Sequence, residues 1–153
     1  MNAFNVREAG QDDVEQLCQL LAQLFAQEAE FSPDPELQAK GLLLILKGQD
    51  VGRILLAESG GQIIGMINLL YTVSTALGGR VALLEDMVVD RSFRGLGVGE
   101  RLLSAGLDQA RADGCLRVTL LTDQDNGRAH SFYERNGFVR SPMVPFRRLL
   151  RDD

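Results

Sequence analysis

Three glycines at alternating positions mark the segment of this sequence with the clearest chemical meaning. The run is Arg94-Gly95-Leu96-Gly97-Val98-Gly99, and it lies between an apolar stretch and a segment whose leucines repeat at helical spacing. Glycines have no Cβ atoms, so the main-chain N–H groups of such a loop can gather around one point, and the positive end of the following helix adds to them. The loop is therefore expected to bind an anion, most naturally a phosphate or pyrophosphate.

The other residues of the loop limit which phosphate ligand it can bind. A Walker A loop needs Gly-Lys-Ser/Thr, and Lys47 is the last lysine of the sequence. The dinucleotide pattern G-x-G-x-x-G is also excluded, because Glu100 stands where its last glycine should be. What remains is Arg-x-x-Gly-x-Gly, with Arg94, Gly97 and Gly99 at the defined positions. Taken alone, this pattern would also suit a tight strand-to-helix turn that binds nothing.

Two carboxylates interrupt the apolar stretch before the loop. Glu85 and Asp86 lie within residues 81–89, which are otherwise mostly aliphatic. A carboxylate is costly there unless it is paired or faces a wet cleft, so each is a candidate proton acceptor. Because neighbouring strand residues point to opposite faces, the two are not expected to act as a close pair. The alternative is that both only hold neighbouring loops.

The elements that must position these residues follow from changes in the hydrophobic period. The stretch 81–89 is apolar on both faces, which predicts a central strand. Asp12 with Glu15 resembles a capping box that opens a first helix, and Asp34 with Pro35 is expected to open a second. Further helices are expected after the glycine loop and over residues 126–136, where Gly137 is a typical stop. Other strands are expected at residues 4–7, 54–57, 63–67, 116–120, 138–139 and 146–150, with a turn at Gly60-Gly61.

The composition fits one folded domain and argues against several classes of partner. The chain has 153 residues, of which 45% are hydrophobic and 24% charged, with a net charge of −5. No Lys/Arg run is longer than Arg147-Arg148, so nucleic acid is not an expected partner, whereas the acidic balance suits a cationic one. Cys18 and Cys115 form no C-x-x-C pair, and no metal site is expected.

Membrane insertion is not expected either. The longest aliphatic run covers residues 42–46, far fewer than the roughly 20 residues that span a bilayer. The first residues also lack the apolar core of a signal peptide. These features predict a cytoplasmic protein.

A second motif gives the glycine loop its context. The sequence continues to Asn126-Gly127-Arg128-Ala129-His130-Ser131-Phe132-Tyr133-Glu134-Arg135-Asn136-Gly137-Phe138. This segment resembles the signature N-x-x-A-x-x-F-Y-x-x-x-G-F of the GNAT N-acetyltransferase superfamily at every defined position. The glycine loop resembles the pyrophosphate loop of the same family, and residues 84–89 resemble the strand before it. The resemblance covers nearly the whole chain, so residues 1–153 are expected to form a single N-acetyltransferase domain.

The resemblance implies a fold and a donor substrate. The fold is mixed α/β, with one mostly antiparallel sheet of about six to seven strands, about four flanking helices and a splay between the two central parallel strands. The donor is acetyl-CoA, without a metal. The family pattern assigns the pyrophosphate to the loop residues and the pantetheine arm to main-chain groups of the strand, one of which would also face the thioester oxygen. The implied cofactor-binding residues are Met87, Val88, Val89, Arg94, Gly95, Leu96, Gly97, Val98, Gly99, Asn126 and Tyr133.

The resemblance also implies catalytic roles. Tyr133 matches the family tyrosine proposed as the general acid that protonates the leaving thiolate. Glu85 stands at the position often proposed as the base in members that act on diamines, and we favour it over Asp86 or water alone. His130, the only histidine, stands at a variable position of the signature and lacks triad partners, so we do not place it in the site.

The acceptor is expected to be a small cationic amine. In this family the first two helices and their connection usually wall the acceptor site. Here that region carries an acidic cluster around Phe31, formed by Glu28, Glu30, Asp34 and Glu36. Such a cluster suits ion pairing and cation–π contact with a polyamine, a diamine or an aminoglycoside. The expected substrate-binding residues are Glu28, Glu30, Phe31 and Glu85.

Two other functions fit the same motifs. One is acetylation of a protein N-terminus or lysine, and the other is a non-catalytic acetyl-CoA-binding module that regulates a partner. The presence of both Glu85 and Tyr133 argues against the second. Many relatives form homodimers, but the sequence does not locate an interface.

Overall fold

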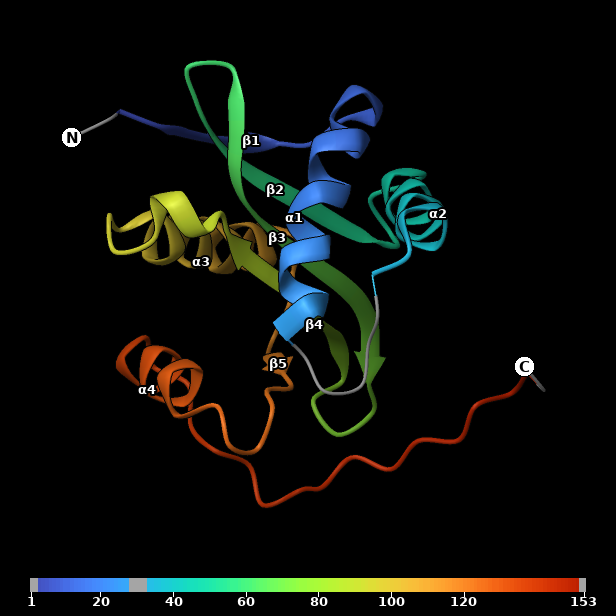
Figure 1. Cartoon of the computed structure of the whole chain (residues 1–153). Helices are drawn as coiled ribbons and strands as arrows, with labels where there is room; N and C mark the ends of the chain where they lie inside the picture. The colour runs from blue at the N-terminus through green and yellow to red at the C-terminus, as the bar shows by residue number, and fades with distance from the viewer. Residues whose placement is uncertain (1–2, 28–32, 152–153) are drawn as a thin grey trace. The chain divides into compact units, whose positions relative to one another are not determined.

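A computed structural model describes residues 3–27 and 33–151 of the chain. Its contacts divide the chain into two compact units, which meet between Asp123 and Gln124 and are described separately. The first unit contains eight of the helices and strands labelled in Figure 1. In chain order these are β1 (Asn5–Glu8), α1 (Val14–Gln27), α2 (Pro35–Leu46), β2 (Gly52–Ser59), β3 (Gln62–Ser74), β4 (Gly79–Val89), α3 (Val98–Ala112) and β5 (Val118–Leu120).

The strands form one mixed, mostly antiparallel sheet in the order β1-β2-β3-β4-β5. Only β4 and β5 run parallel, and β4 lies between β3 and β5 as expected for a central strand. The pairing of β4 with β5 ends at Leu84, whereas its pairing with β3 continues to Val89. The last part of β4 therefore has a ladder on one side only, which is the splay expected between the parallel strands.

Helices cover both faces of this sheet. Helices α1 and α2 pack on one face, in a cluster of buried aliphatic residues that includes Leu17, Leu42, Met66 and Val88. Helix α3 packs on the other face (Figure 1). Its close approach depends on Gly65, because a Cβ atom there would lie 2.8 Å from the Leu102 side chain. The two faces thus hold separate apolar layers.

Local sequence signals explain where several elements begin. The Asp34 side chain accepts a hydrogen bond from the Leu37 N–H at 3.3 Å, and Pro35 is the first residue of α2, which confirms the expected cap. Gly60 and Gly61 turn β2 into β3 with φ values of 56° and 81°.

The start of the first helix differs from expectation. A 3₁₀ turn, Gln11–Asp13, precedes α1, and the Asp13 side chain accepts a hydrogen bond from the Gly10 N–H at 2.8 Å. The predicted box of Asp12 with Glu15 was wrong because the cap lies earlier in the chain. The box contains Asp13, whose carboxylate also pairs with Arg7.

The second unit contains α4 (Gly127–Arg135), which ends before Gly137 at φ 91°. Residues 138–150 contain no strand, so the described sheet has five strands where six to seven were expected. Pro142 and Pro145 lack the N–H that a ladder needs, and Phe146 is 97% exposed. Alternating residues in this tail predicted strands that the structure does not form.

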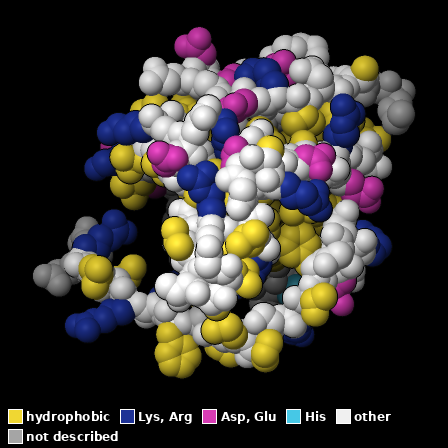
Figure 2. All heavy atoms as spheres, turned by 180° about the vertical axis from the view of Figure 1, so that it is seen from behind, with side chains coloured by type: hydrophobic (Ala, Val, Ile, Leu, Met, Phe, Trp, Pro, Cys, Tyr) yellow, Lys and Arg dark blue, Asp and Glu magenta, His cyan; other side chains and the backbone are white. Residues whose placement is uncertain are grey.

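Charged side chains of both signs lie on the face of the molecule that Figure 2 shows. Figure 2, which shows the molecule from behind, has Lys and Arg interspersed with Asp and Glu. Across residues 3–27 and 33–151, none of the helices combines the length and apolar character needed to cross a bilayer. The longest, α3, has 15 residues.

Candidate functional site

The glycine loop has the backbone conformation that an anion-binding loop needs. Gly95 and Gly97 have φ values of 79° and 84°, in the left-handed region that other residues rarely adopt. Gly97 is the N-cap of α3, and no side chain of the described residues caps this helix. A Cβ atom at either glycine would have no described atom within 4 Å. These glycines are thus required by backbone shape, and the space above them is open to a ligand.

The loop is tied to the splayed end of β4. Arg94 Nε donates to the Val89 carbonyl oxygen at 3.1 Å, so the predicted loop and the predicted strand residues lie together. The Asp90 N–H donates to the Ile64 carbonyl on β3. By strand alternation, the main-chain groups of Met87 and Val89 face the splay, whereas those of Val88 face β3. Contact of Met87, Val88 and Val89 with the donor stays a prediction.

A cavity of about 320 Å³ lies between α1, α2, β3 and β4. Its apolar wall comes from leucine, isoleucine and phenylalanine side chains of the two helices. Its polar lining consists of Asp34, Gln38, Asn68, Glu85 and Asp86. All five side chains carry hydrogen-bond acceptors, and none of the described lining residues is basic. The cavity is therefore suited to a cationic hydrogen-bond donor.

Glu85 and Asp86 line this cavity together, which corrects the expectation that they point to opposite faces. The cause is a β-bulge. Across the β3–β4 ladder Asn68 pairs with Asp86 and Leu69 with Leu84, so Glu85 is the extra residue on β4. A bulge breaks the alternation of side chains and re-aims the inserted residue. Glu85 is exposed, whereas Asp86 is partly buried.

Asn68 is a site residue that the sequence interpretation missed. Its side chain is 2% exposed, and its Nδ2 donates to Asp86 Oδ2 at 2.6 Å. Asn68 Oδ1 and Gln38 Oε1 are buried acceptors without a hydrogen-bond partner. The available signal was a single amide within the apolar run 63–70, which is as unusual as the carboxylates of the next strand.

The other predicted substrate contacts have a mixed outcome. Glu28, Glu30 and Phe31 lie outside the described residues. Asp34, from the same acidic cluster, lines the cavity. The region between the first two helices thus contributes one acidic side chain, Asp34, to the described cavity lining, and its contact with a substrate stays a prediction.

In the second unit, Tyr133 is held by aromatic neighbours. Its ring lies edge-on to Phe132 and Phe138, with centroid distances of 5.2 Å and 5.6 Å. Burial raises the pKa of Tyr133 to about 12, so the phenol stays protonated at neutral pH. Asn126 caps α4 by accepting a hydrogen bond from the Ala129 N–H at 3.2 Å. Asn126 is therefore the N-cap of α4, and contact of Asn126 or Tyr133 with the donor stays a prediction.

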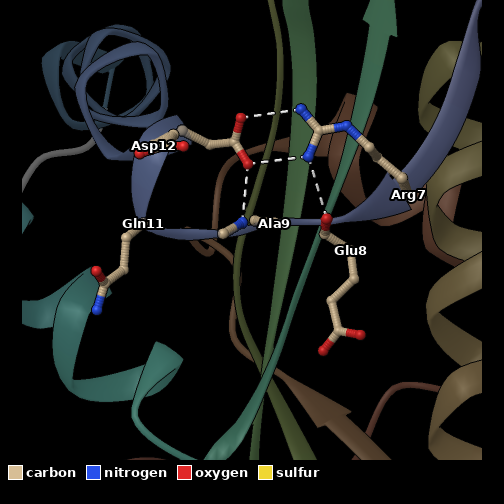
Figure 3. A pocket seen from close by; sticks show the side chains of 7 residues that line it. Arg7, Glu8, Ala9, Gln11 and Asp12 are labelled. Atoms are coloured by element: carbon tan, nitrogen blue, oxygen red, sulfur yellow. Dashed lines mark hydrogen bonds and ion pairs between the residues drawn. The ribbon is translucent and has the colours of Figure 1, made fainter.

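A second hollow, of about 620 Å³, lies beside residues 7–13 (Figure 3). The two terminal nitrogens of Arg7 donate hydrogen bonds to the two carboxylate oxygens of Asp13, each at 2.9 Å. The Arg7 Nε pairs with Glu58 at 3.0 Å. These contacts join β1 to the start of α1 and to β2. The charges of Arg7 and Asp13 are thus used within the fold, and we assign the hollow a structural role.

Residues 3–27 and 33–151 contain no cluster of three or more His, Cys, Asp or Glu side chains that could hold a metal ion. Cys18 and Cys115 are both free thiols, and burial raises the pKa of each.

Known proteins with similar sequences are acetyltransferases. The model of the Acetyltransferase (GNAT) family matches residues 14–138. The uncharacterized N-acetyltransferase YhfO of Bacillus subtilis (strain 168) is 36% identical over 137 residues, which cover 88% of this chain and 89% of that protein. The aminoalkylphosphonate N-acetyltransferase of Salmonella typhimurium is 26% identical over 141 residues, covering 92% and 88%.

A solved structure shows the same fold. The aminoglycoside N-acetyltransferase AAC(6′)-Iy in complex with CoA matches with a TM-score of 0.82 and 21% sequence identity. The match covers 99% of this chain and 97% of that one. At this identity the likeness concerns the fold alone.

Proposed function

The chain belongs to the GNAT acetyltransferase family and is an acyltransferase, and we propose that it acetylates a small cationic amine held in the cavity between α1, α2, β3 and β4. One observation carries the proposal. The polar lining of that cavity includes the carboxylates of Asp34, Glu85 and Asp86 and the unpaired amide oxygens of Asn68 and Gln38, without a basic side chain among the described lining residues. An ammonium group supplies donors for these oxygens and the positive charge that the described lining lacks.

Acetyl-CoA is the acetyl donor of this family, and the loop fits its pyrophosphate. Left-handed glycines, an uncapped helix start and open space above Gly95 and Gly97 together form a concave set of main-chain donors. In the proposed arrangement, Met87 and Val89 pair with the pantetheine arm along the splayed edge of β4. When bound, acetyl-CoA supplies an acetyl thioester, whose transfer to the amine forms an amide and releases a thiol.

Glu85 is the proposed proton acceptor. A primary alkylamine with a pKa near 10.4 is only about 0.04% neutral at pH 7, so it must lose a proton before its nitrogen can attack. Glu85 is exposed and lies on the bulge, where it can receive that proton directly or through water. Asp86 is engaged by the Asn68 amide. This difference favours Glu85 as base and gives Asp86 a positioning role.

Tyr133 is the proposed donor of the proton that the leaving sulfur needs. Its raised pKa keeps the phenol protonated at neutral pH. In a direct transfer within a ternary complex, the ammonium nitrogen loses two protons and the leaving thiolate gains one. Glu85 takes the first proton before attack, Tyr133 protonates the thiolate, and the second amine proton, lost as the tetrahedral adduct collapses, restores the Tyr133 phenol. The Tyr133→Phe variant should lower turnover about tenfold to a thousandfold with nearly unchanged coenzyme affinity.

The chemistry of the cavity also distinguishes among the substrates of relatives. An aminoalkylphosphonate carries an anion close to its amine, and three carboxylates would repel it. An aminoglycoside carries several cationic amines, which the same carboxylates would attract. We therefore favour polyamines, diamines and aminoglycosides as acceptors. That residues 1–153 act as a single domain, in the cytoplasm and as a homodimer, stays a prediction.

A panel of amines tests the proposal. The purified chain is mixed with acetyl-CoA and with spermidine, an aminoglycoside, an alanine-terminated peptide or 2-aminoethylphosphonate, and thiol release is followed. We expect turnover with the first two only. Turnover restricted to the peptide would show a protein acetyltransferase. Coenzyme binding by calorimetry without thiol release on any amine would show a regulatory module.

A further inference from the structure

Two buried amides distinguish this cavity from a surface group of acidic side chains. Asn68 is 2% exposed and Gln38 is 9% exposed, and the carbonyl oxygen of each has no hydrogen-bond partner. A buried acceptor without a partner costs stability, so such groups call for an explanation in function. Both amides line the same cavity as Glu85 and Asp86.

The orientation of the Asn68 amide is fixed by its neighbour. Asn68 Nδ2 donates to Asp86 Oδ2 at 2.6 Å, a short charge-assisted hydrogen bond. Rotating the amide would place its oxygen against the carboxylate, so Oδ1 must remain the group that awaits a donor. The carboxylate of Asp86 thus sets which end of the Asn68 amide a ligand meets.

Asp34 is exposed, in contrast to the buried Asn68 of the same cavity lining. It is an exposed residue at the start of α2, and it caps that helix through the Leu37 N–H. The cavity therefore has a buried acceptor on β3 and an exposed carboxylate on α2. A molecule that reaches from one to the other would need a donor at each end.

We propose that Asn68 is a specificity-determining residue whose Oδ1 accepts a hydrogen bond from the reacting amine, while Asp34 binds a second cationic group of the same molecule. The substrate class is a diamine or polyamine. Amines that carry a carboxylate or phosphate in place of the second cation are rejected. This inference rests on the proposed function and narrows it to two-ended recognition.

Three four-carbon amines form a matched test series. They are 1,4-diaminobutane, butylamine and 4-aminobutanoate, which differ only in the charge at the far end. For the wild-type chain, kcat/KM should fall at least about tenfold from the first to the second and again to the third. Equal values for the diamine and butylamine, or a preference for the aminobutanoate, would overturn the inference.

Two variants test which residue binds each end of the diamine. Asn68→Leu should lower kcat/KM about tenfold or more for both the diamine and butylamine, because both lose the inner acceptor. Asp34→Asn keeps the helix cap and removes only the charge. It should lower kcat/KM about tenfold for the diamine and by less than about twofold for butylamine. A purely structural role of Asp34 would change both amines equally.

Coenzyme affinity, measured by calorimetry, is the control for both variants and should stay within about twofold of the wild type. If Asn68→Leu does not fold, the wild-type ranking and the Asp34→Asn ratio still decide the inference. If no amine is acetylated by the wild-type chain, the proposed function itself fails. If amines are acetylated but folded Asn68→Leu keeps wild-type constants, only the inference fails.

Discussion

The two polar clusters built around Asp113 and around Asn68 differ in how completely their hydrogen bonds are made. Asp113 accepts from Arg53 Nε at 2.8 Å, from Arg53 Nη2 at 3.0 Å, from the Tyr71 hydroxyl at 2.5 Å and from Gln109 at 3.1 Å. In the cavity, by contrast, Asn68 makes one side-chain bond and leaves its oxygen unpaired.

The difference separates a cluster that stabilises the fold from one that is prepared for a ligand. Arg53 and Asp113 have 10% and 12% of their side chains exposed, and each neutralises the other. Their bonds join β2 and β3 to the end of α3. In the cavity, Asn68 donates to Asp86, but the amide oxygens of Asn68 and Gln38 receive no donor from the described residues. A donor from outside the chain would complete them, and four experiments can test this contrast.

The largest effect is expected from breaking the saturated cluster. Asp113→Ala leaves the Arg53 guanidinium buried without its main partner, which should lower the free energy of unfolding by about 3–5 kcal/mol. Urea unfolding followed by circular dichroism measures the loss. Asp108→Ala is the matched control, since Asp108 is 74% exposed and pairs with Arg111 near the same helix end. Its effect should stay below about 0.5 kcal/mol. Similar losses in the two variants would mean that the buried Asp113–Arg53 pair contributes no more to the free energy of unfolding than the exposed Asp108–Arg111 pair.

The next effect concerns the cavity and should appear in the rate. Glu85→Gln removes the proposed base while keeping the size of an exposed side chain, so turnover should fall about a hundredfold, equivalent to about 2.7 kcal/mol. Stability should change by less than about 0.5 kcal/mol. Steady-state kinetics with a diamine across pH 6–10 measures the first, and urea unfolding the second. Unchanged turnover, with the chemical step limiting, would pass the role of base to Asp86 or water.

The bulge at Glu85 also shows what could be predicted from the sequence and what could not. The order of elements, the central position of β4, the α2 cap and the glycine loop all depend on local patterns, and the structure confirms them. The pairing of Asn68 with Asp86 depends on the register between two strands, which local periodicity does not encode. Because of the bulge, Glu85 lines the same cavity as Asp86 and not the opposite face. The strand register also adds Asn68 to that lining.

In the C-terminal tail, residues 138–150, local patterns predicted strands that the structure does not contain. Residues 138–139 and 146–150 have strand-like composition, yet they form no strand. A strand needs a partner edge with free donors and acceptors, and a sequence pattern cannot supply one. The resemblance to the family predicted six to seven strands. Pro142 and Pro145, however, lack the N–H groups that this tail would need to pair with a neighbouring strand.

A smaller effect is expected from titrating the saturated cluster. Hydrogen bonds from the Arg53 side chain hold the pKa of Asp113 below its usual value. A folded-state pKa that is lowered gives stability that is present above the unfolded pKa, about 3.9, and is lost as the pH falls through the folded value. The stability difference between the wild type and Asp113→Asn should therefore shrink from pH 7 towards pH 2. Urea midpoints at four pH values measure it. A difference that stays constant over this range would show that the charge of Asp113 contributes nothing.

The smallest effect tests the unsaturated cluster from the opposite direction. Gln38→Met replaces a buried acceptor that has no partner with an apolar side chain of similar length and helix propensity. Because the lost carbonyl leaves no other group unpaired, the free energy of unfolding should rise by about 0.5–1 kcal/mol, while KM for a diamine rises severalfold. Gln109→Met is the matched control, since Gln109 donates to Asp113 at 3.1 Å and its loss should lower stability. Changes of opposite sign in these two variants would confirm the contrast between the clusters, and destabilisation by Gln38→Met would show that its amide already supports the fold.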